Sequence, residues 1–341
     1  MVQEKEFWAS GKKRPQRSCP IVRLIQRDYV LDAKGKRLKL FGHQARILNH
    51  FFQPGGGNRK LLPKLPYRTV VYSCPKKSGK TEVAAAVTYA YARIYGGLCL
   101  SIANDKDQAT NNMFSRILDM LNRVRVQDPE RYEREVKRMT ADEIEFHLSD
   151  PDLPIKEKRN LRPNGAASIR AIPCDPAGEA GHERLALTAW DELWAYGRSD
   201  VTRRLWQELQ PIPSIPYSMR LVTTYAGYYG ESETLWEIYS RAINPDPHTD
   251  TPRGHSVLRG LPVYAEGSLA AYWDHECRLP WQTPEFLEEA RTDPVTLAQP
   301  AEYKRLWENR WTTGLESFMD MQRLDGIMEQ AEREGIHNAY P

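Results

Sequence analysis

Lys80 and Thr81 follow Gly79 in a short segment whose residue types suit phosphate binding. In a loop that joins a strand to a helix, backbone N–H groups cradle phosphates, a Lys neutralises the β and γ oxygens, and a Ser or Thr ligates magnesium. Cys74 occupies the position where the usual pattern has its first glycine. We therefore expect a nucleotide site with ATP and Mg²⁺ as its ligands. The residues expected to line it are Pro75, Lys76, Lys77, Ser78, Gly79, Lys80 and Thr81.

Asp191 and Glu192 end a second apolar run, residues 185–190. We expect Asp191 to hold the magnesium ion, and Glu192 to orient and deprotonate an attacking water, as phosphoryl transfer to water requires. Adjacent strand residues point to opposite faces, so Glu192 reaches the same site only if the chain turns directly after Asp191. The alternative interpretation is a pair of acids at a helix N-terminus.

Two weaker candidates complete the set. Thr223 and Thr224 end another apolar strand, where their hydroxyls could sense the γ-phosphate, although strand-end threonines also serve structure. Gln44 lies upstream of the loop, and its amide offers one donor side and one acceptor to an adenine edge.

The elements that must position these groups alternate along the chain. Strands are predicted at 67–73 and 98–103, and helices at 82–95 and 105–124, from β-branched runs and from apolar residues at helical spacing. This order predicts an α/β fold with a mostly parallel sheet, whose catalytic groups gather at the carboxyl ends of the strands.

The remaining segments are expected to lie around that sheet. Residues 128–138 are highly charged and predict an exposed helix, followed by a surface strand at 144–148. Further strands are expected within 164–173 and at 221–224. Beyond residue 230 the strand signals weaken, and helices are expected at 231–243, 284–291 and 301–309. This part predicts a smaller subdomain.

Composition sets limits on the classes of function. The chain has 341 residues and a net charge of +3, so any contact with DNA must be local. The basic residues Lys12, Lys13, Arg14 and Arg17 are interpreted as a solvated tail. The five cysteines show no CxxC pair, which argues against a zinc site or a disulfide framework. No apolar run reaches about 18 residues, and we expect neither export nor membrane insertion.

Four features follow one another along the chain: Gln44, the loop 75–81, the Asp191-Glu192 pair and the Thr223-Thr224 pair. In this order they resemble the ATPase domain of the large terminase subunit of tailed bacteriophages. The segment 303–311 is similar to the end of that family's lid or linker region. The resemblance implies a P-loop NTPase fold of the RecA/ASCE type, plus a small C-terminal helical lid. The implied division is an N-terminal extension at 1–40, an ATPase core at 41–230 and a lid or linker at 231–341.

The resemblance also implies partners and a location. It implies a motor in the host cytoplasm that moves double-stranded DNA into a procapsid, with a portal protein and a small terminase subunit as partners. Family members form a ring, usually a pentamer, in which an arginine of one subunit completes the neighbour's site. Here Arg184 is the preferred candidate and Arg170 the second, while Lys76 or Lys77 stands where some members carry a cis arginine.

Large terminases normally continue into a nuclease domain built on clustered aspartates. After Trp311 about 30 residues follow, so we expect no nuclease activity from this chain. Glu316, Asp320 and Asp325 are assigned to a solvated face.

Two alternatives remain open. A two-lobed helicase shares an upstream Gln, the loop and the Asp-Glu pair, but needs a second lobe. A nucleotide-binding scaffold would bind ATP tightly and hydrolyse it slowly.

Overall fold

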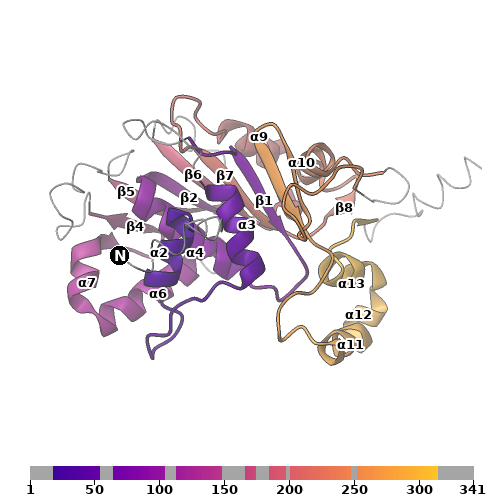
Figure 1. Cartoon of the computed structure of the whole chain (residues 1–341), viewed down its shortest axis with the longest axis horizontal. Helices are drawn as coiled ribbons and strands as arrows, with labels where there is room; N and C mark the ends of the chain where they lie inside the picture. The colour runs from indigo at the N-terminus through magenta and orange to yellow at the C-terminus, as the bar shows by residue number, and fades with distance from the viewer. Residues whose placement is uncertain are drawn as a thin grey trace, which may run out of the picture.

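A computed structural model describes residues 18–53, 64–103, 113–147, 166–173, 184–196, 200–246 and 252–313. Within these residues the central element is a nine-stranded sheet in the order β3-β4-β5-β2-β6-β7-β1-β10-β9 (Figure 1). Its strands are β1 (Thr69–Ser73), β2 (Gly97–Ala103), β3 (Val136–Met139), β4 (Glu143–Phe146), β5 (Ala167–Pro173), β6 (Leu185–Asp191), β7 (Met219–Thr224), β9 (Val263–Glu266) and β10 (Leu269–Trp273). The strands from β5 to β10 in this order run parallel, while β3, β4 and β9 pair antiparallel. The predicted α/β fold with a mostly parallel sheet is confirmed.

Helices cover both faces of the sheet. They are α2 (Pro20–Asp28), α3 (Gly42–Phe52), α4 (Lys80–Tyr95), α6 (Met113–Gln127), α7 (Pro129–Glu135), α9 (Asp200–Glu208), α10 (Glu233–Ile243), α11 (Pro284–Thr292), α12 (Pro294–Ala298) and α13 (Pro300–Trp307), with a 3-10 turn η1 (Leu193–Tyr196). One hydrophobic core joins α2, α3, α4 and α6 to one face, and a second joins η1, α9 and α10 to the other. A short parallel pair, β8 (Tyr228–Tyr229) with β11 (Thr312–Thr313), lies outside the main sheet.

The strand that leads into the loop is buried on both faces. Val70 and Tyr72 belong to the first core and Val71 to the second, because successive strand side chains point to opposite faces. On the first face α4 packs through small residues, and Ala84, Ala85 and Ala86 are almost fully buried. β1 and α4 are therefore held as one unit, and they fix the loop between them.

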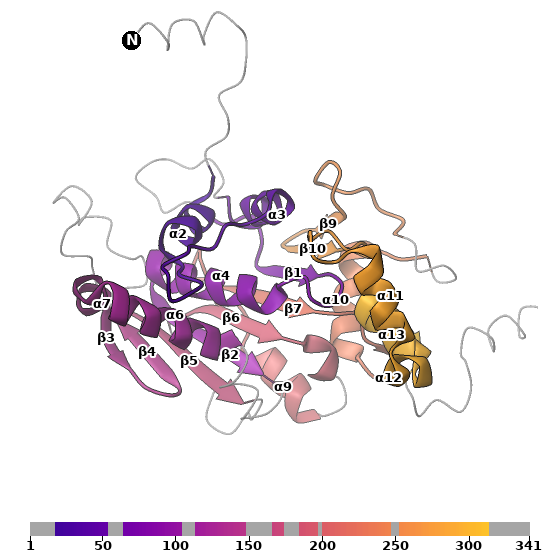
Figure 2. The ribbon, with the colours of Figure 1, turned by 90° about the horizontal axis from the view of Figure 1, so that it is seen from below.

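The sheet continues beyond residue 230. The strand signals in the sequence are weak there, and a smaller subdomain was predicted. β10 pairs in parallel with β1, and β9 pairs antiparallel with β10. Alanines at positions 270 and 271 weaken the local strand preference of β10, which explains why it was missed. The helices α11, α12 and α13 form the smaller body, and Figure 2 shows them together at the end of the sheet toward which β1 and β7 run.

The charged segment expected to be an exposed helix is partly buried instead. It folds as α7 and the edge strand β3. Arg131 and Glu135 of α7 are buried, and Glu135 accepts from Arg131 at 3.1 Å and forms an ion pair with Arg93 at 3.3 Å. The Tyr89 hydroxyl donates to the same carboxylate at 3.0 Å. Charges that satisfy one another in this way can be buried, and charge density alone did not reveal the pairing.

Two further observations hold for the described part of the chain. No helix in it is long and apolar enough to cross a bilayer. Its cysteines Cys19, Cys74, Cys99 and Cys277 form no disulfide with one another. Several residues singled out in the sequence lie outside the described residues, namely Lys12, Lys13, Arg14, Arg17, Cys174, Glu316, Asp320 and Asp325.

Candidate active site

The loop between β1 and α4 has the backbone that an anion site needs. Gly79 immediately precedes α4 with φ of 70°, a left-handed conformation that favours glycine. Lys77 also has a positive φ, of 65°. The Ser78 hydroxyl donates to the Pro75 carbonyl at 2.5 Å and closes the loop on itself. The N-terminus of α4 is thereby opened toward a ligand, as phosphate binding by a helix end requires.

Cys74 explains how the loop dispenses with its usual first glycine. Its φ is not positive, so a side chain is tolerated at this position. That side chain is buried in the core of the first face, and burial raises the pKa of the thiol to about 11. Cys74 is therefore a packing residue, and its carbonyl accepts a hydrogen bond from Lys80.

The Lys80 side chain is buried and curls back over the loop. Its Nζ donates to the Cys74 carbonyl at 2.9 Å and lies 3.2 Å from the centre of the Tyr225 ring. Burial lowers the pKa of Lys80, and the nearby acids Glu192 and Asp191 oppose that shift. Within the described residues Lys80 forms no ion pair. Its charge is therefore available to an anion that enters the loop.

Asp191 and Glu192 lie at the carboxyl end of β6, two strands away from the loop strand in the sheet. Asp191 accepts from the Thr223 hydroxyl at 2.9 Å. Glu192 has φ of 56°, and its N–H donates to the Thr223 carbonyl at 2.7 Å. The chain therefore turns directly after Asp191, which is the condition that the sequence set for Glu192 to act at the same site.

The two carboxyl groups are tuned by their surroundings. Burial raises the pKa of Glu192 to about 7, with a smaller contribution from Asp191 and an opposing one from Lys80. Burial also raises the pKa of Asp191, against the hydrogen bond from Thr223. A carboxylate with a pKa near neutrality is suited to accept a proton from water at physiological pH.

Thr223 and Thr224 connect the acids to the rest of the site. Thr223 lies between β6 and the loop strand, because β7 pairs with both β6 and β1. The Thr224 hydroxyl accepts from the Trp194 N–H at 3.3 Å and donates to the Tyr225 carbonyl at 2.9 Å. Both hydroxyls therefore hold neighbouring groups in place, and any sensing of a phosphate would pass through these bonds.

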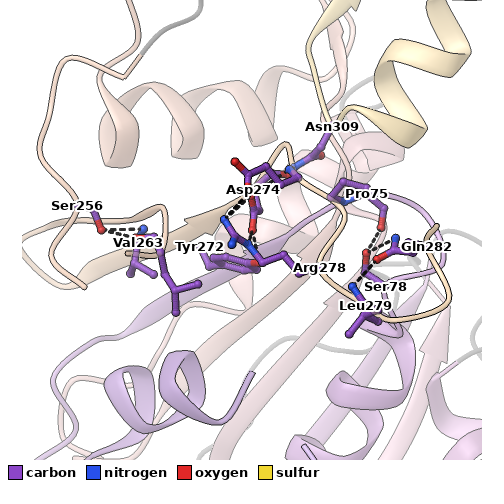
Figure 3. Close-up of polar contacts among 12 residues, drawn as sticks. Pro75, Ser78, Ser256, Val263, Tyr272, Asp274, Arg278, Leu279, Gln282 and Asn309 are labelled. Carbon is purple, nitrogen blue, oxygen red and sulfur yellow. Dashed lines mark hydrogen bonds and ion pairs between the residues drawn. The ribbon is translucent and has the colours of Figure 1, made fainter. Parts of the chain in front are cut away.

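The segment that follows β10 forms hydrogen bonds with the loop between β1 and α4. The sequence did not predict these contacts. The Gln282 amide donates to the Lys76 carbonyl at 2.9 Å. It also donates to the Ser78 hydroxyl at 3.1 Å, a contact drawn in Figure 3. The Trp281 indole donates to the Lys77 carbonyl at 2.9 Å. From α13, the Leu306 carbonyl accepts from the Lys76 N–H at 2.6 Å. Four hydrogen bonds to three residues, Trp281, Gln282 and Leu306, thus fix the loop.

Asn309, just after α13, forms hydrogen bonds at the carboxyl ends of three strands, β1, β7 and β10. Its carbonyl oxygen accepts from the Ser73 hydroxyl at 3.0 Å and from the Ala226 N–H at 2.7 Å. Its amide donates to the Asp274 carbonyl at 3.0 Å, and Figure 3 shows the two residues side by side. Asn309 has φ of 51°, and its side chain is fully buried. Only the resemblance of 303–311 to a lid region had drawn attention to this segment.

Arg305, also on α13, is a second residue that the sequence did not single out. Its buried guanidinium lies 4.0 Å from the centre of the Trp194 ring, and its charge acts on both Lys80 and Glu192. An arginine on a short helix far along the chain has no local signal that could have marked it.

The other predicted residues fall in different places. Gln44 is buried, and its side-chain oxygen accepts from the Phe41 N–H at 3.1 Å, which caps α3. Lys76 lies over the Trp307 ring beside a hollow of about 490 Å³. Arg184 lies next to the amino end of β6, at the opposite edge of the sheet from Asp191, and Arg170 pairs with Glu143 at 3.1 Å. Neither arginine is brought to the loop of its own chain.

The donor set fits ATP and Mg²⁺. The Asp191 carboxylate and the Thr81 hydroxyl are hard oxygen ligands of the kind that magnesium prefers. Thr81 is in the first turn of α4 and partly exposed, so its side chain is accessible from the loop. The helix end, the left-handed Gly79 and the Lys80 charge, which forms no ion pair with the residues that the structure describes, suit a polyphosphate.

Three solved structures are similar to this chain. The crystal structure of the HK97 bacteriophage large terminase matches over 86% of this chain with a TM-score of 0.53 and 12% sequence identity. The ATPase domain of the Thermus phage P74-26 large terminase matches over 80% of this chain and 99% of its own, with 15% identity and a TM-score of 0.48. A mutant of that domain matches over 72% of this chain and 90% of its own, with 16% identity and a TM-score of 0.49.

The likeness to the HK97 protein shows that this chain shares its fold with a phage large terminase. The match covers 55% of the HK97 chain, so the present chain spans about half the length of that protein. No protein-family model and no curated protein match the sequence.

Proposed function

We propose that this chain hydrolyses ATP and that hydrolysis drives the movement of double-stranded DNA. The observation that carries the proposal is the proximity of Lys80 to Asp191 and Glu192 at the carboxyl ends of β1 and β6, two parallel strands with β7 between them. Lys80 is buried and has no ion-pair partner among the described residues, and it lies near the buried Asp191 and the partly buried Glu192, whose pKa is raised to about 7. That combination suits transfer of a phosphoryl group to water.

Each side chain has a defined task in this reaction. The Lys80 charge and the N–H groups at the start of α4 bind the phosphates and stabilise negative charge as the terminal phosphoryl group leaves. Glu192 orients the attacking water and accepts its proton at a carboxylate oxygen. Asp191 and Thr81 would hold Mg²⁺, which when bound neutralises charge on the phosphate oxygens. Thr223 keeps the Asp191 carboxylate in place through their 2.9 Å hydrogen bond.

The DNA-packaging role rests on the fold and on the order of the motifs. The HK97 protein of the same fold is a phage large terminase. By that analogy the substrate is double-stranded viral DNA, and the partners are a portal protein and a small terminase subunit. The same analogy suggests a ring of copies of this chain in the host cytoplasm, with five members as is usual in the family, in which Arg184 or Arg170 reaches the neighbour's site.

ATP turnover with and without linear double-stranded DNA tests the proposal. We expect DNA to stimulate phosphate release, and turnover per chain to rise with protein concentration if a neighbour completes the site. Lys80→Ala should lower turnover by at least about 100-fold, because a charge aimed at the transition state is lost. Lys34→Ala, at an exposed position, is the matched control.

The outcomes separate the alternatives. Turnover that survives Lys80→Ala in pure protein overturns the hydrolytic site. Tight ATP binding with negligible turnover in the presence of DNA would favour a nucleotide-binding scaffold. Turnover that responds neither to DNA nor to protein concentration would remove the motor while leaving the ATPase.

A further inference from the structure

Arg305 is a buried cation held at the boundary between α13 and the site. Its side chain is 3% exposed. It forms an ion pair with Glu302 of the same helix at 2.8 Å and donates to the Ala226 carbonyl at 3.5 Å. A buried guanidinium is costly unless its charge and its N–H groups are satisfied, so its position is closely defined by these bonds.

Two aromatic rings enclose that guanidinium. Its central carbon lies 4.0 Å from the centre of the Trp194 ring and 4.8 Å from that of Tyr228. The two rings meet edge to face at 5.8 Å. Arginine favours such stacking because its guanidinium is planar and weakly hydrated. The plane of the Trp194 indole is therefore set by Arg305 on its face and by the Tyr228 ring, which lies at 77° to it.

Trp194 in turn holds the hydrolytic glutamate. Its indole N–H donates to the Glu192 carboxylate at 2.7 Å. The backbone of Trp194 is fixed separately, since its N–H donates to the Thr224 hydroxyl and its carbonyl accepts from the Ser232 hydroxyl at 2.7 Å. With the backbone anchored, the direction of the indole N–H depends on what packs against the ring.

The same helix also touches the phosphate loop. Leu306, the residue after Arg305, accepts from the Lys76 N–H. One turn of α13 thus contacts both the loop that would bind phosphate and, through Trp194, the group that would activate water. The sequence separation between Arg305 and Glu192 is large, so only the seating of α13 brings them together.

We propose that Arg305 is a positioning residue which, by covering the Trp194 ring, aims the indole N–H that orients the Glu192 carboxylate. Hydrolysis then depends on α13 being seated against η1, while ATP binding at the loop does not require the stack. This inference rests on the proposed hydrolysis at Lys80 and Glu192, and it adds a part of the site that the lid supplies.

Steady-state kinetics of a small variant set test the inference in the full chain. Trp194→Phe keeps a ring for Arg305 to cover but removes the indole N–H. Arg305→Met removes the planar cation, and Arg305→Lys keeps the charge without the planar face. We expect each to lower kcat by about 10- to 100-fold, the range for a displaced catalytic group, with ATP affinity within about twofold of wild type. The double variant Trp194→Phe with Arg305→Met should be no worse than the poorer single variant, because both act through one hydrogen bond.

Trp206→Phe and Arg220→Lys are the matched controls, since Arg220 stacks on Trp206 at 3.9 Å away from the site. A wild-type kcat in Trp194→Phe overturns the inference. A double variant in which the losses in kcat of the two single variants add also overturns it. Wild-type kcat in Arg305→Lys also overturns it, because charge alone would then suffice. Should Arg305→Met fail to fold, Trp194→Phe still decides. If wild-type protein shows no turnover that depends on Lys80, the proposed function fails instead.

Discussion

Two arginine–tryptophan stacks lie at opposite ends of strand β7, and they differ in what they hold. At the amino end Arg220, on the strand itself, covers Trp206 at 3.9 Å and donates to the Leu209 carbonyl at 3.2 Å. At the carboxyl end Arg305 covers Trp194 at nearly the same distance, 4.0 Å, but comes from α13. The first arginine is bonded to main-chain carbonyls, whereas the second is paired with a carboxylate of its own helix.

The difference shows that the stack alone does not mark a functional residue. Burial lowers the pKa of Arg220 to about 9, because burying its charge is unfavourable. The hydrogen bonds to the Leu209 and Trp206 carbonyls offset this free-energy cost. The Trp194 indole, by contrast, donates to Glu192, a group with a task in the proposed reaction. We therefore expect changes at the amino end to alter stability and changes at the carboxyl end to alter turnover.

Glu192→Gln should give the largest effect of all. Glutamine keeps the size of the side chain and an oxygen for the Trp194 N–H, but it cannot accept a proton. We expect turnover to fall by about 10²- to 10⁴-fold, the usual contribution of a general base, while ATP binding is retained. Phosphate release and equilibrium binding of ATP, measured on the same preparation, check this.

Glu208→Gln, on the exposed end of α9 near the amino end of β7, is its matched control. It should leave both quantities unchanged. A parallel loss of binding and turnover in Glu192→Gln would assign Glu192 a structural role and remove the contrast between the two ends.

Arg220→Met should give the converse result. Its loss leaves the Leu209 and Trp206 carbonyls without their donor in a buried setting. We expect the free energy of unfolding to fall by about 1–3 kcal/mol, the cost of unsatisfied buried acceptors, with kcat of the folded protein unchanged. Urea denaturation and turnover measure the two effects, and Arg204→Met at an exposed position is the control. Reduced kcat at unchanged stability would mean that the amino end communicates with the site.

The pH dependence of stability sharpens the comparison further. Burial raises the pKa of Glu192 from 4.5 to about 7, so between these values the folded chain keeps a proton that the unfolded chain has released. The resulting stabilisation is fully present below pH 4.5 and is lost as pH rises through 7. Glu192→Gln removes it. The stability of wild type relative to this variant should therefore fall with rising pH, by at most about 1.4 kcal/mol per pH unit.

Urea denaturation from about pH 5 to pH 8, with a chelator and without nucleotide, measures this difference. The chelator matters because a bound cation at Asp191 would change the charge that Glu192 faces. Curves for wild type and variant that stay parallel over this range would show that Glu192 is not held in a desolvated setting.

The features of the structure that depend on a few adjacent residues were predicted from the sequence. The β-branched run before the loop and the helix after it were expected, and β1 and α4 follow that expectation. The left-handed Gly79 and the turn at Glu192 also follow from requirements that the motif itself imposes. These features depend on a few adjacent residues, so one sequence suffices to find them.

Features that depend on distant packing were missed or assigned differently. Arg305 and Asn309 have ordinary local surroundings and gain their importance only when α13 meets β1 and β7. The alanines of β10 hide a strand that is stabilised by its neighbour β1. Gln44, proposed as an adenine reader, has its acceptor bonded to the start of its own helix, so a structural role accounts for that oxygen. Reading of adenine by Gln44 remains a prediction.

Arg184→Ala should have the smallest effect on the isolated chain. Arg184 is exposed at the amino edge of the sheet, beside a hollow of about 530 Å³, and donates to the Ala166 carbonyl at 3.3 Å. Removing an exposed side chain of this kind should change the unfolding free energy by less than about 0.5 kcal/mol. Turnover at low protein concentration should also be unchanged, because Arg184 lies at the end of β6 opposite Asp191. If Arg184 completes a neighbour's site, the variant loses only the rise in turnover with protein concentration and DNA. Arg170→Ala, measured in the same series, tests the second candidate. A full concentration-dependent rise in both variants would mean that neither arginine acts in trans, and that the amino edge is structural throughout.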